Sequence, residues 1–159
     1  MSRPPKADPI AWFTAERVNL RTVVGQACQA GRVDLARQLA SFQCAFQHLQ
    51  DRHDDAELLW RMIGDCADQS DGGRADAIYA RLRVAASEIE RGRALDARGD
   101  MAWCVEAAEQ ERESATLALA LYWRGACAFD LDDMEQARRD VDRESQGGAP
   151  SRLAGGRTH

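Results

Sequence analysis

The sequence predicts an all-α fold of about seven helices. Ala, Leu, Arg and Glu, which have high helix propensity, are frequent along most of the chain. Apolar residues recur at spacings of three and four, and no segment shows the alternation typical of a half-buried strand. At 159 residues the chain has the length of a single domain.

The first three helices are predicted from caps, apolar stripes and glycines. Asp8-Pro9 favours a helix start, because Asp can cap it and Pro needs no amide donor there. This helix is expected to run to about Ala30, before Gly31. A second helix carries an apolar stripe that we expect to be buried: Leu35, Leu39, Phe42, Phe46 and Leu49. A third, over 54–69, carries Ala56, Leu59, Trp60, Ile63 and Ala67 on one face.

Four further helices follow by the same reasoning. The fourth starts near Arg74 with Ile78, Leu82, Ala85 and Ile89 on one side. It is expected to end at Gly99, so that Asp100 caps a short fifth helix. The sixth begins after Ser114, and Asp132-Asp133 introduces the seventh. The helical domain is expected over 8–144, with a flexible segment at 1–7 and a disordered tail at 145–159, which is rich in Gly, Ser, Arg and Pro.

A short pattern recurs in the second half of the chain. Arg91-Gly92 and Asp100-Met101 return 33 positions later (125 minus 92) as Arg124-Gly125 and Asp133-Met134. A period near 34 with two helices per unit is typical of tetratricopeptide repeats. Gly92 and Gly125 would be the small residues of the first helices, each with a small partner twelve positions later. We therefore expect a right-handed superhelical stack of antiparallel helical hairpins.

A more particular resemblance lies near the N-terminus. The segment Ala11-Trp12-Phe13-Thr14-Ala15-Glu16-Arg17-Val18-Asn19-Leu20 matches an A-W-[FL]-x-A-E-R-x-N-L stretch, and Arg52-His53-Asp54-Asp55 matches a later [HRW]-x-D-[DW] element. Both resemble the repeat region of actinobacterial transcriptional regulators of the Streptomyces antibiotic regulatory type and their NB-ARC relatives. The resemblance covers residues 8 to about 70.

The resemblance implies a sensor or partner-binding region that controls a transcription factor. Members normally also carry a DNA-binding head and a nucleotide-binding middle. This chain has no G-x-x-x-x-G-K-[ST] phosphate loop. We therefore expect no cofactor and carry over neither ATPase nor DNA-binding activity, whether the chain is a fragment or a stand-alone relative.

Composition narrows the function further. A net charge of -5 disfavours direct binding to nucleic acid. No apolar run approaches the roughly 18 residues of a membrane span, and Met1 to Pro9 is polar, so a cytoplasmic location is expected. Five widely spaced cysteines, none in a Cys-x-x-Cys pair, are interpreted as buried thiols: Cys28, Cys44, Cys66, Cys104 and Cys127.

The candidate catalytic and metal residues favour structural interpretations. Cys44, His48 and His53 lack a fourth ligand, so no metal site is expected. Ser41, His48 and Asp51 have the residue types of a catalytic triad but no nucleophile elbow. Asp54-Asp55 are better explained as charges at a helix N-terminus. Arg81, Arg83, Arg91 and Arg93 are interpreted as a solvated face. The chain is therefore not expected to be an enzyme.

One surface is a candidate for binding a protein or peptide. In the last repeat the core positions are Leu121, Gly125 and Ala128. The concave face would present Leu119, Tyr122, Trp123 and Phe129, flanked by Arg93 and Asp130. Aromatic and Arg anchors of this kind suit an amphipathic helix or short peptide. Two alternatives stay open: the seventh helix or a further repeat covers this patch, or the chain is a scaffold that forms a homo-oligomer.

Overall fold

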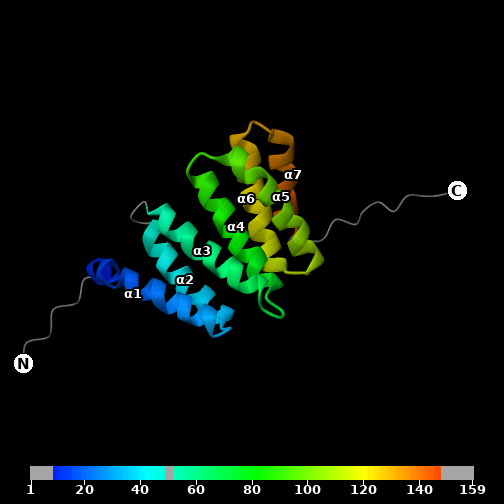
Figure 1. The fold of residues 1–159 in the computed structure, drawn as a ribbon. Helices are drawn as coiled ribbons and strands as arrows, with labels where there is room; N and C mark the ends of the chain where they lie inside the picture. Colours follow the sequence, from blue (N-terminus) through cyan, green and yellow to red (C-terminus); the bar gives the residue numbers. More distant parts are fainter. Residues whose placement is uncertain (1–8, 49–51, 148–159) are drawn as a thin grey trace, which may run out of the picture. The chain divides into compact units, whose positions relative to one another are not determined.

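A computed structural model describes residues 9–48 and 52–147, and within them the chain is all-α with seven helices and no strand (Figure 1). This confirms the predicted class and helix number. The helices are α1 Pro9–Gln29, α2 Val33–His48, α3 His53–Asp68, α4 Arg74–Glu90, α5 Ala94–Gln110, α6 Ser114–Asp130 and α7 Met134–Ser145. The predicted flexible segment 1–7 and most of the predicted tail 145–159 lie outside the described residues.

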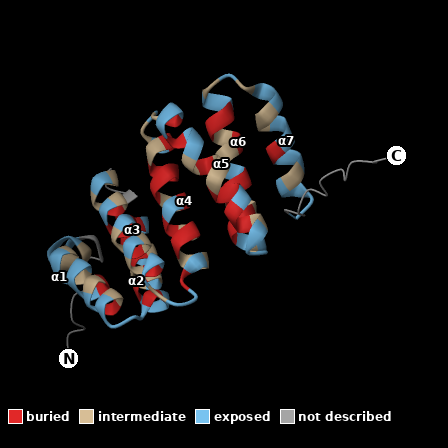
Figure 2. Cartoon of the chain, turned by 45° about the vertical axis from the view of Figure 1, so that its right-hand side comes forward, coloured by how far each residue is buried: buried red, intermediate tan, exposed pale blue. Residues whose placement is uncertain are grey.

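The chain divides into two compact units, Met1–Val84 and Ala85–His159, with the division inside α4. In the first unit α1, α2 and α3 pack against one another. In the second, α5 packs on α6 and α6 on α7. Figure 2 shows the corresponding pattern of burial, with long buried stripes on α4 and α5 and a largely exposed α1.

The predicted buried face of α2 is wrong for the four members that the structure describes, while the fifth, Leu49, lies outside the described residues. Leu35 and Phe42 are exposed, Phe42 by 72 %, and Leu39 and Phe46 are only half-buried. The buried face instead carries small residues, among them Ala36, Ala40 and Cys44. The Cys44 thiol lies 3.8 Å from the Ala56 carbonyl of α3. Small side chains let the helix backbones approach, and this close approach outweighs the larger apolar area of the opposite stripe.

The predicted faces of α3 and α4 are correct. All five apolar residues predicted on α3 are buried, and so are Ile78, Leu82, Ala85 and Ile89 of α4. Trp60 packs edge-on against Tyr79 at 5.5 Å between ring centroids. The guanidinium of Arg83 lies 5.8 Å from the centre of the Trp60 ring, so this arginine belongs to a packed cation-π contact and not to a purely solvated face.

The positions of the turns show the actual repeat length in the second half of the chain. Left-handed backbone occurs at Gly72, Gly92, Arg112 and Asp132, which are 20 residues apart (92 minus 72). Consecutive helices from α4 to α6 are each 17 residues long. Gly99 therefore lies inside α5, which corrects the prediction that α4 ends there and that the fifth helix is short. A two-helix unit spans 40 residues, longer than the 34 expected for a tetratricopeptide repeat.

The predicted packing glycines are half right. Gly125 lies in α6, and a β-carbon there would be 3.6 Å from the carbonyl oxygen of Ala137. Ala137 is the small partner predicted twelve positions after Gly125. Gly92 lies in the turn after α4, where a β-carbon would meet nothing within 4 Å. Its φ of 73° explains the glycine instead. In the 40-residue register the counterparts of Gly125 and Ala137 are Ala85 and Ala97, both fully buried.

The two segments that carry the family resemblance meet in the first unit. Arg17, in the Ala11–Leu20 stretch of α1, forms an ion pair with Asp55 at 3.3 Å. Asp55 also accepts a hydrogen bond of 2.8 Å from Arg52. Gln43 of α2, which is buried, donates to the Arg17 carbonyl. These polar residues therefore join α1, α2 and α3.

A candidate helix-binding groove between α6 and α7

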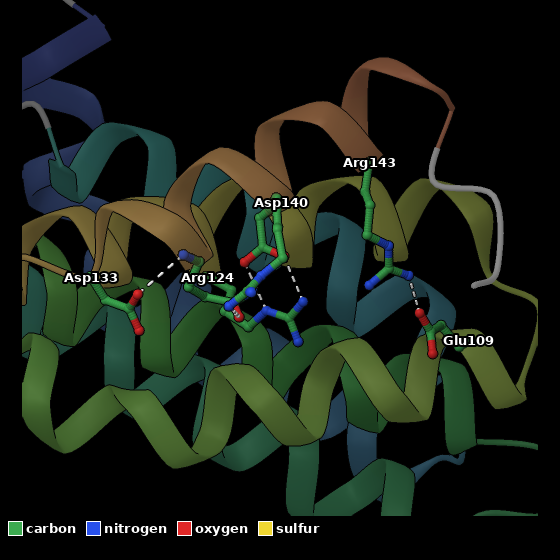
Figure 3. Close-up of polar contacts among 7 residues, drawn as sticks. Glu109, Arg124, Asp133, Asp140 and Arg143 are labelled. Carbon is green, nitrogen blue, oxygen red and sulfur yellow. Dashed lines mark hydrogen bonds and ion pairs between the residues drawn. The ribbon is translucent and has the colours of Figure 1, made fainter. Parts of the chain in front are cut away.

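Two ion pairs fix one side of α7 to the rest of the second unit. Asp140 is fully buried, and its carboxylate accepts hydrogen bonds of 2.9 and 2.6 Å from the guanidinium of Arg124 on α6. Arg143 pairs with Glu109 of α5. Figure 3 shows both pairs bridging from α7 to the neighbouring helices. Because the guanidinium engages both carboxylate oxygens, it fixes the rotation of α7 as well as its distance.

The start of α7 and its approach to α6 are also determined locally. The Asp133 side chain accepts a hydrogen bond of 3.1 Å from the Gln136 backbone amide, as an N-cap does (Figure 3). This confirms the predicted role of Asp132-Asp133. Gly125 lies where α6 and α7 meet, and a β-carbon at this position would be in ordinary van der Waals contact with that of Asp140, at 3.5 Å.

The other side of α7 forms a groove with α6 that opens to solvent. Its volume is about 420 Å³. The lining residues are Tyr122, Gly125, Ala126 and Phe129 of α6 and Met134, Ala137, Arg138 and Val141 of α7. Four of them are large apolar side chains that remain mostly exposed: Tyr122 by 55 %, Phe129 by 61 %, Met134 by 55 % and Val141 by 55 %.

Only part of the predicted binding surface lies in this groove. Tyr122 and Phe129 line it, and Trp123 packs edge-on against Tyr122 with ring centroids 5.3 Å apart. Trp123 and Leu119 are half-buried and are not among the lining residues.

The predicted flanking residues lie elsewhere. Arg93 and Asp130 line a separate hollow with Leu95 and Leu131, formed by the α4–α5 turn and the end of α6. Neither residue lines the groove, although Asp130 directly follows the groove residue Phe129 in the sequence.

Sequence reasoning missed the contribution of α7. Met134 and Val141 are seven residues apart (141 minus 134), with Ala137 and Arg138 between them, which is the spacing of one helix face. This spacing is visible in the sequence, but it does not show which side of α7 packs against α6. The structure shows that Tyr122 and Phe129 stay exposed with α7 in place.

The remaining candidates have structural contacts. The Ser41 hydroxyl donates a hydrogen bond of 2.9 Å to the Arg37 carbonyl, while Asp51 lies outside the described residues. Asp54 and Asp55 fall in the first turn of α3, as predicted. Across residues 9–48 and 52–147, no group of three or more His, Cys, Asp or Glu side chains is placed to hold a metal ion. None of the helices described there combines the length and apolarity needed to cross a bilayer.

Comparison with known proteins does not assign the chain to a family or a function. No protein family matches the chain, and neither a curated protein nor a solved structure matches it.

Proposed function

We propose that the chain is a non-catalytic interaction module whose α6–α7 groove binds an amphipathic helix of a partner protein. The observation that carries this proposal is the exposure of four large apolar side chains on the two walls of one groove. Removing such side chains from water on binding is favourable, at about 25 cal/mol per Å² of apolar surface.

The spacing of the anchors indicates the shape of the occupant. Tyr122 and Phe129 are seven residues apart on α6 (129 minus 122), as are Met134 and Val141 on α7. Seven residues are two helical turns, or about 10 Å. An occupant with apolar residues at positions i, i+3 or i+4, and i+7 presents a stripe of the same length.

The charge of the groove restricts the partner further. Arg138 is the one charged residue among those that line it, and it is exposed. An acidic residue beside the apolar stripe of the partner would pair with this guanidinium. A partner with a basic residue there would meet a like charge, which disfavours the complex.

The proposal extends to the role of the chain in the cell. The resemblance of Ala11–Leu20 and Arg52–Asp55 to actinobacterial transcriptional regulators supports a cytoplasmic sensor or regulatory module of that class, with a tetratricopeptide-like superhelix of hairpins. Transcriptional control would then be exerted through the bound partner, because the net charge of -5 disfavours direct contact with DNA.

A selection experiment tests the groove. A library of random 20-residue peptides is displayed and selected on the chain, and the enriched peptides are titrated against the chain and two variants. We expect apolar residues at i, i+3 or i+4, and i+7 with an acidic neighbour. Phe129→Ser should weaken binding at least about tenfold, since anchors of this size contribute more than 1.4 kcal/mol.

Phe42→Ser is the matched control, because Phe42 is also a largely exposed phenylalanine but lies in the first unit. It should leave the affinity unchanged. Peptides without the predicted spacing, or equal loss of affinity in the two variants, would contradict the proposed groove.

A second function, a scaffold that self-associates, is favoured by a different observation. Phe42 of α2 is 72 % exposed and Leu35, on the same helix, is also exposed. Light scattering over a range of concentrations separates the two functions. A mass that rises with concentration in the wild type and not in Phe42→Ser would support the scaffold, and a constant monomer mass would exclude it.

A further inference from the structure

Helices α1 and α3 touch along a short line near their C-terminal ends. A β-carbon on Gly25 of α1 would lie 3.8 Å from the sulfur of Met62 on α3. One turn further on, the Cys66 thiol donates a hydrogen bond of 3.2 Å to the Cys28 carbonyl. Since the residue numbers rise together on both helices, α1 and α3 run parallel here. This line of contact brings two cysteines to one place.

The remaining three cysteines are in a different situation. Cys44, Cys104 and Cys127 are buried, whereas Cys28 and Cys66 are partly exposed at the edge of the first unit's core. Cys44 and Cys127 direct their thiols to the carbonyls of Ala56 and Ala94, whereas the carbonyl that the Cys66 thiol contacts belongs to another cysteine, Cys28. Proximity to a second thiol together with access from solvent therefore distinguishes Cys28 and Cys66. It also corrects the expectation that all five thiols are buried.

The environment of Cys28 keeps its thiol protonated at neutral pH. Burial, and the hydrogen bond and charge of the neighbouring Cys66, raise the pKa of Cys28 to about 12. The thiolate is the nucleophile in thiol–disulfide exchange, so the reaction of this pair should accelerate as the pH rises.

We propose that Cys28 and Cys66 form a modification site, a dithiol that low-molecular-weight disulfides such as oxidised glutathione convert to an intramolecular disulfide between α1 and α3. One cysteine thiolate attacks a glutathione sulfur, giving a mixed disulfide and releasing one glutathione thiolate. The second cysteine thiolate then attacks the protein sulfur of that mixed disulfide and releases the second glutathione. Two protein thiols are oxidised and one molecule of oxidised glutathione is reduced to two thiols.

The product has a predictable effect on the fold. The bond closes a loop of 38 residues (66 minus 28) that contains all of α2. A cross-link over a loop of this length reduces the entropy of the unfolded chain and should raise the thermal midpoint by several degrees. The approach of the Cys66 thiol to within 3.2 Å of the Cys28 carbonyl is the contact that brings the two cysteines together.

The test treats the folded full-length chain with oxidised glutathione and measures its intact mass. We expect the loss of two hydrogen atoms and, after trypsin digestion without reduction, one cross-linked pair of peptides carrying Cys28 and Cys66. The thermal midpoint should rise and return on reduction. A glutathione adduct that persists in place of the link, a link between other cysteines, or no change would overturn the proposal.

Variants separate the site from general thiol reactivity. Cys28→Ser and Cys66→Ser should each lose the intramolecular link and instead retain a glutathione adduct on the remaining cysteine. Cys44→Ala should keep the link. The same treatment of the wild type in guanidinium should give several different pairings, and an equally varied set from the folded chain would contradict a site made by the α1–α3 contact.

Discussion

Asp140 accepts both of its short hydrogen bonds from Arg124, at a position that solvent does not reach. Removing one partner of a buried ion pair leaves the other charge uncompensated. Asp140→Ala should therefore lower the free energy of unfolding by about 3–5 kcal/mol in urea titrations. Glu135→Ala is the control, because its pair with Arg139 is largely exposed. Equal effects of the two substitutions would show that Asp140 does not anchor α7.

Two glycines should respond to alanine in opposite directions. In Gly125→Ala the new β-carbon meets Asp140 at an ordinary contact distance of 3.5 Å, so the higher helix propensity of alanine should stabilise the chain by up to about 1 kcal/mol. Gly92→Ala places a β-carbon on left-handed backbone and should destabilise it by about 1–2 kcal/mol. Chemical denaturation measures both. Loss of stability in Gly125→Ala would mean that α6 and α7 are closer than described.

Stability should fall in alkaline solution partly through Cys44. Burial raises the pKa of its thiol from 9.0 to about 12, so folding favours the protonated form. The protonated thiol therefore contributes its full amount to the free energy of unfolding below pH 9. This stabilisation is lost as the pH rises from 9 towards 12. The difference in unfolding free energy between wild type and Cys44→Ala should therefore shrink across that range. Other titrating groups are common to both chains, and a constant difference would contradict the buried thiol.

Much of the fold follows from local sequence patterns. The helical class, the number of helices, and the buried faces of α3 and α4 are predictable, because these helices bury large residues at regular spacing. The cap at Asp133 is predictable for a similar reason, since it depends on residues only three positions apart. In each case, interactions between residues close in sequence are enough to predict the structure.

The errors arose where packing depends on distant residues. On α2 the stripe with Leu35 and Phe42 has the larger apolar area, but the stripe with Ala36 and Ala40 is buried because a neighbouring backbone comes close. Likewise Gly92 and Gly125 share a sequence pattern but serve a turn and a helix contact respectively. A single sequence does not distinguish a glycine needed for its φ from one that lies in a helix contact.

The candidate site was partly predictable for the same reason. Tyr122 and Phe129 stand out as large apolar residues off the core face of their helix, and both are exposed in the groove. Arg93 does not line the groove, and its expected position depended on the repeat register. Met134 and Val141 were missed because their exposure depends on which side of α7 the Arg124–Asp140 pair turns inward.

The effect of a charge on the groove wall is a further expectation. Val141→Asp places a carboxylate among the apolar anchors, and it should weaken a selected amphipathic peptide more than Val141→Ala does. Val141 is 55 % exposed, so neither change should unfold the chain. Circular dichroism checks the fold while fluorescence anisotropy measures the affinity. Tighter binding to Val141→Asp would contradict an acidic, apolar partner.

The most direct measurement of the central claim is a chemical-shift titration of methyl-labelled chain with one selected peptide. Met134 of the groove and Met101, which is fully buried in α5, provide an internal comparison. The account predicts that the Met134 methyl signal shifts in proportion to bound peptide while the Met101 signal stays in place. Binding that leaves the Met134 signal unmoved would contradict the assignment of the α6–α7 groove as the partner site.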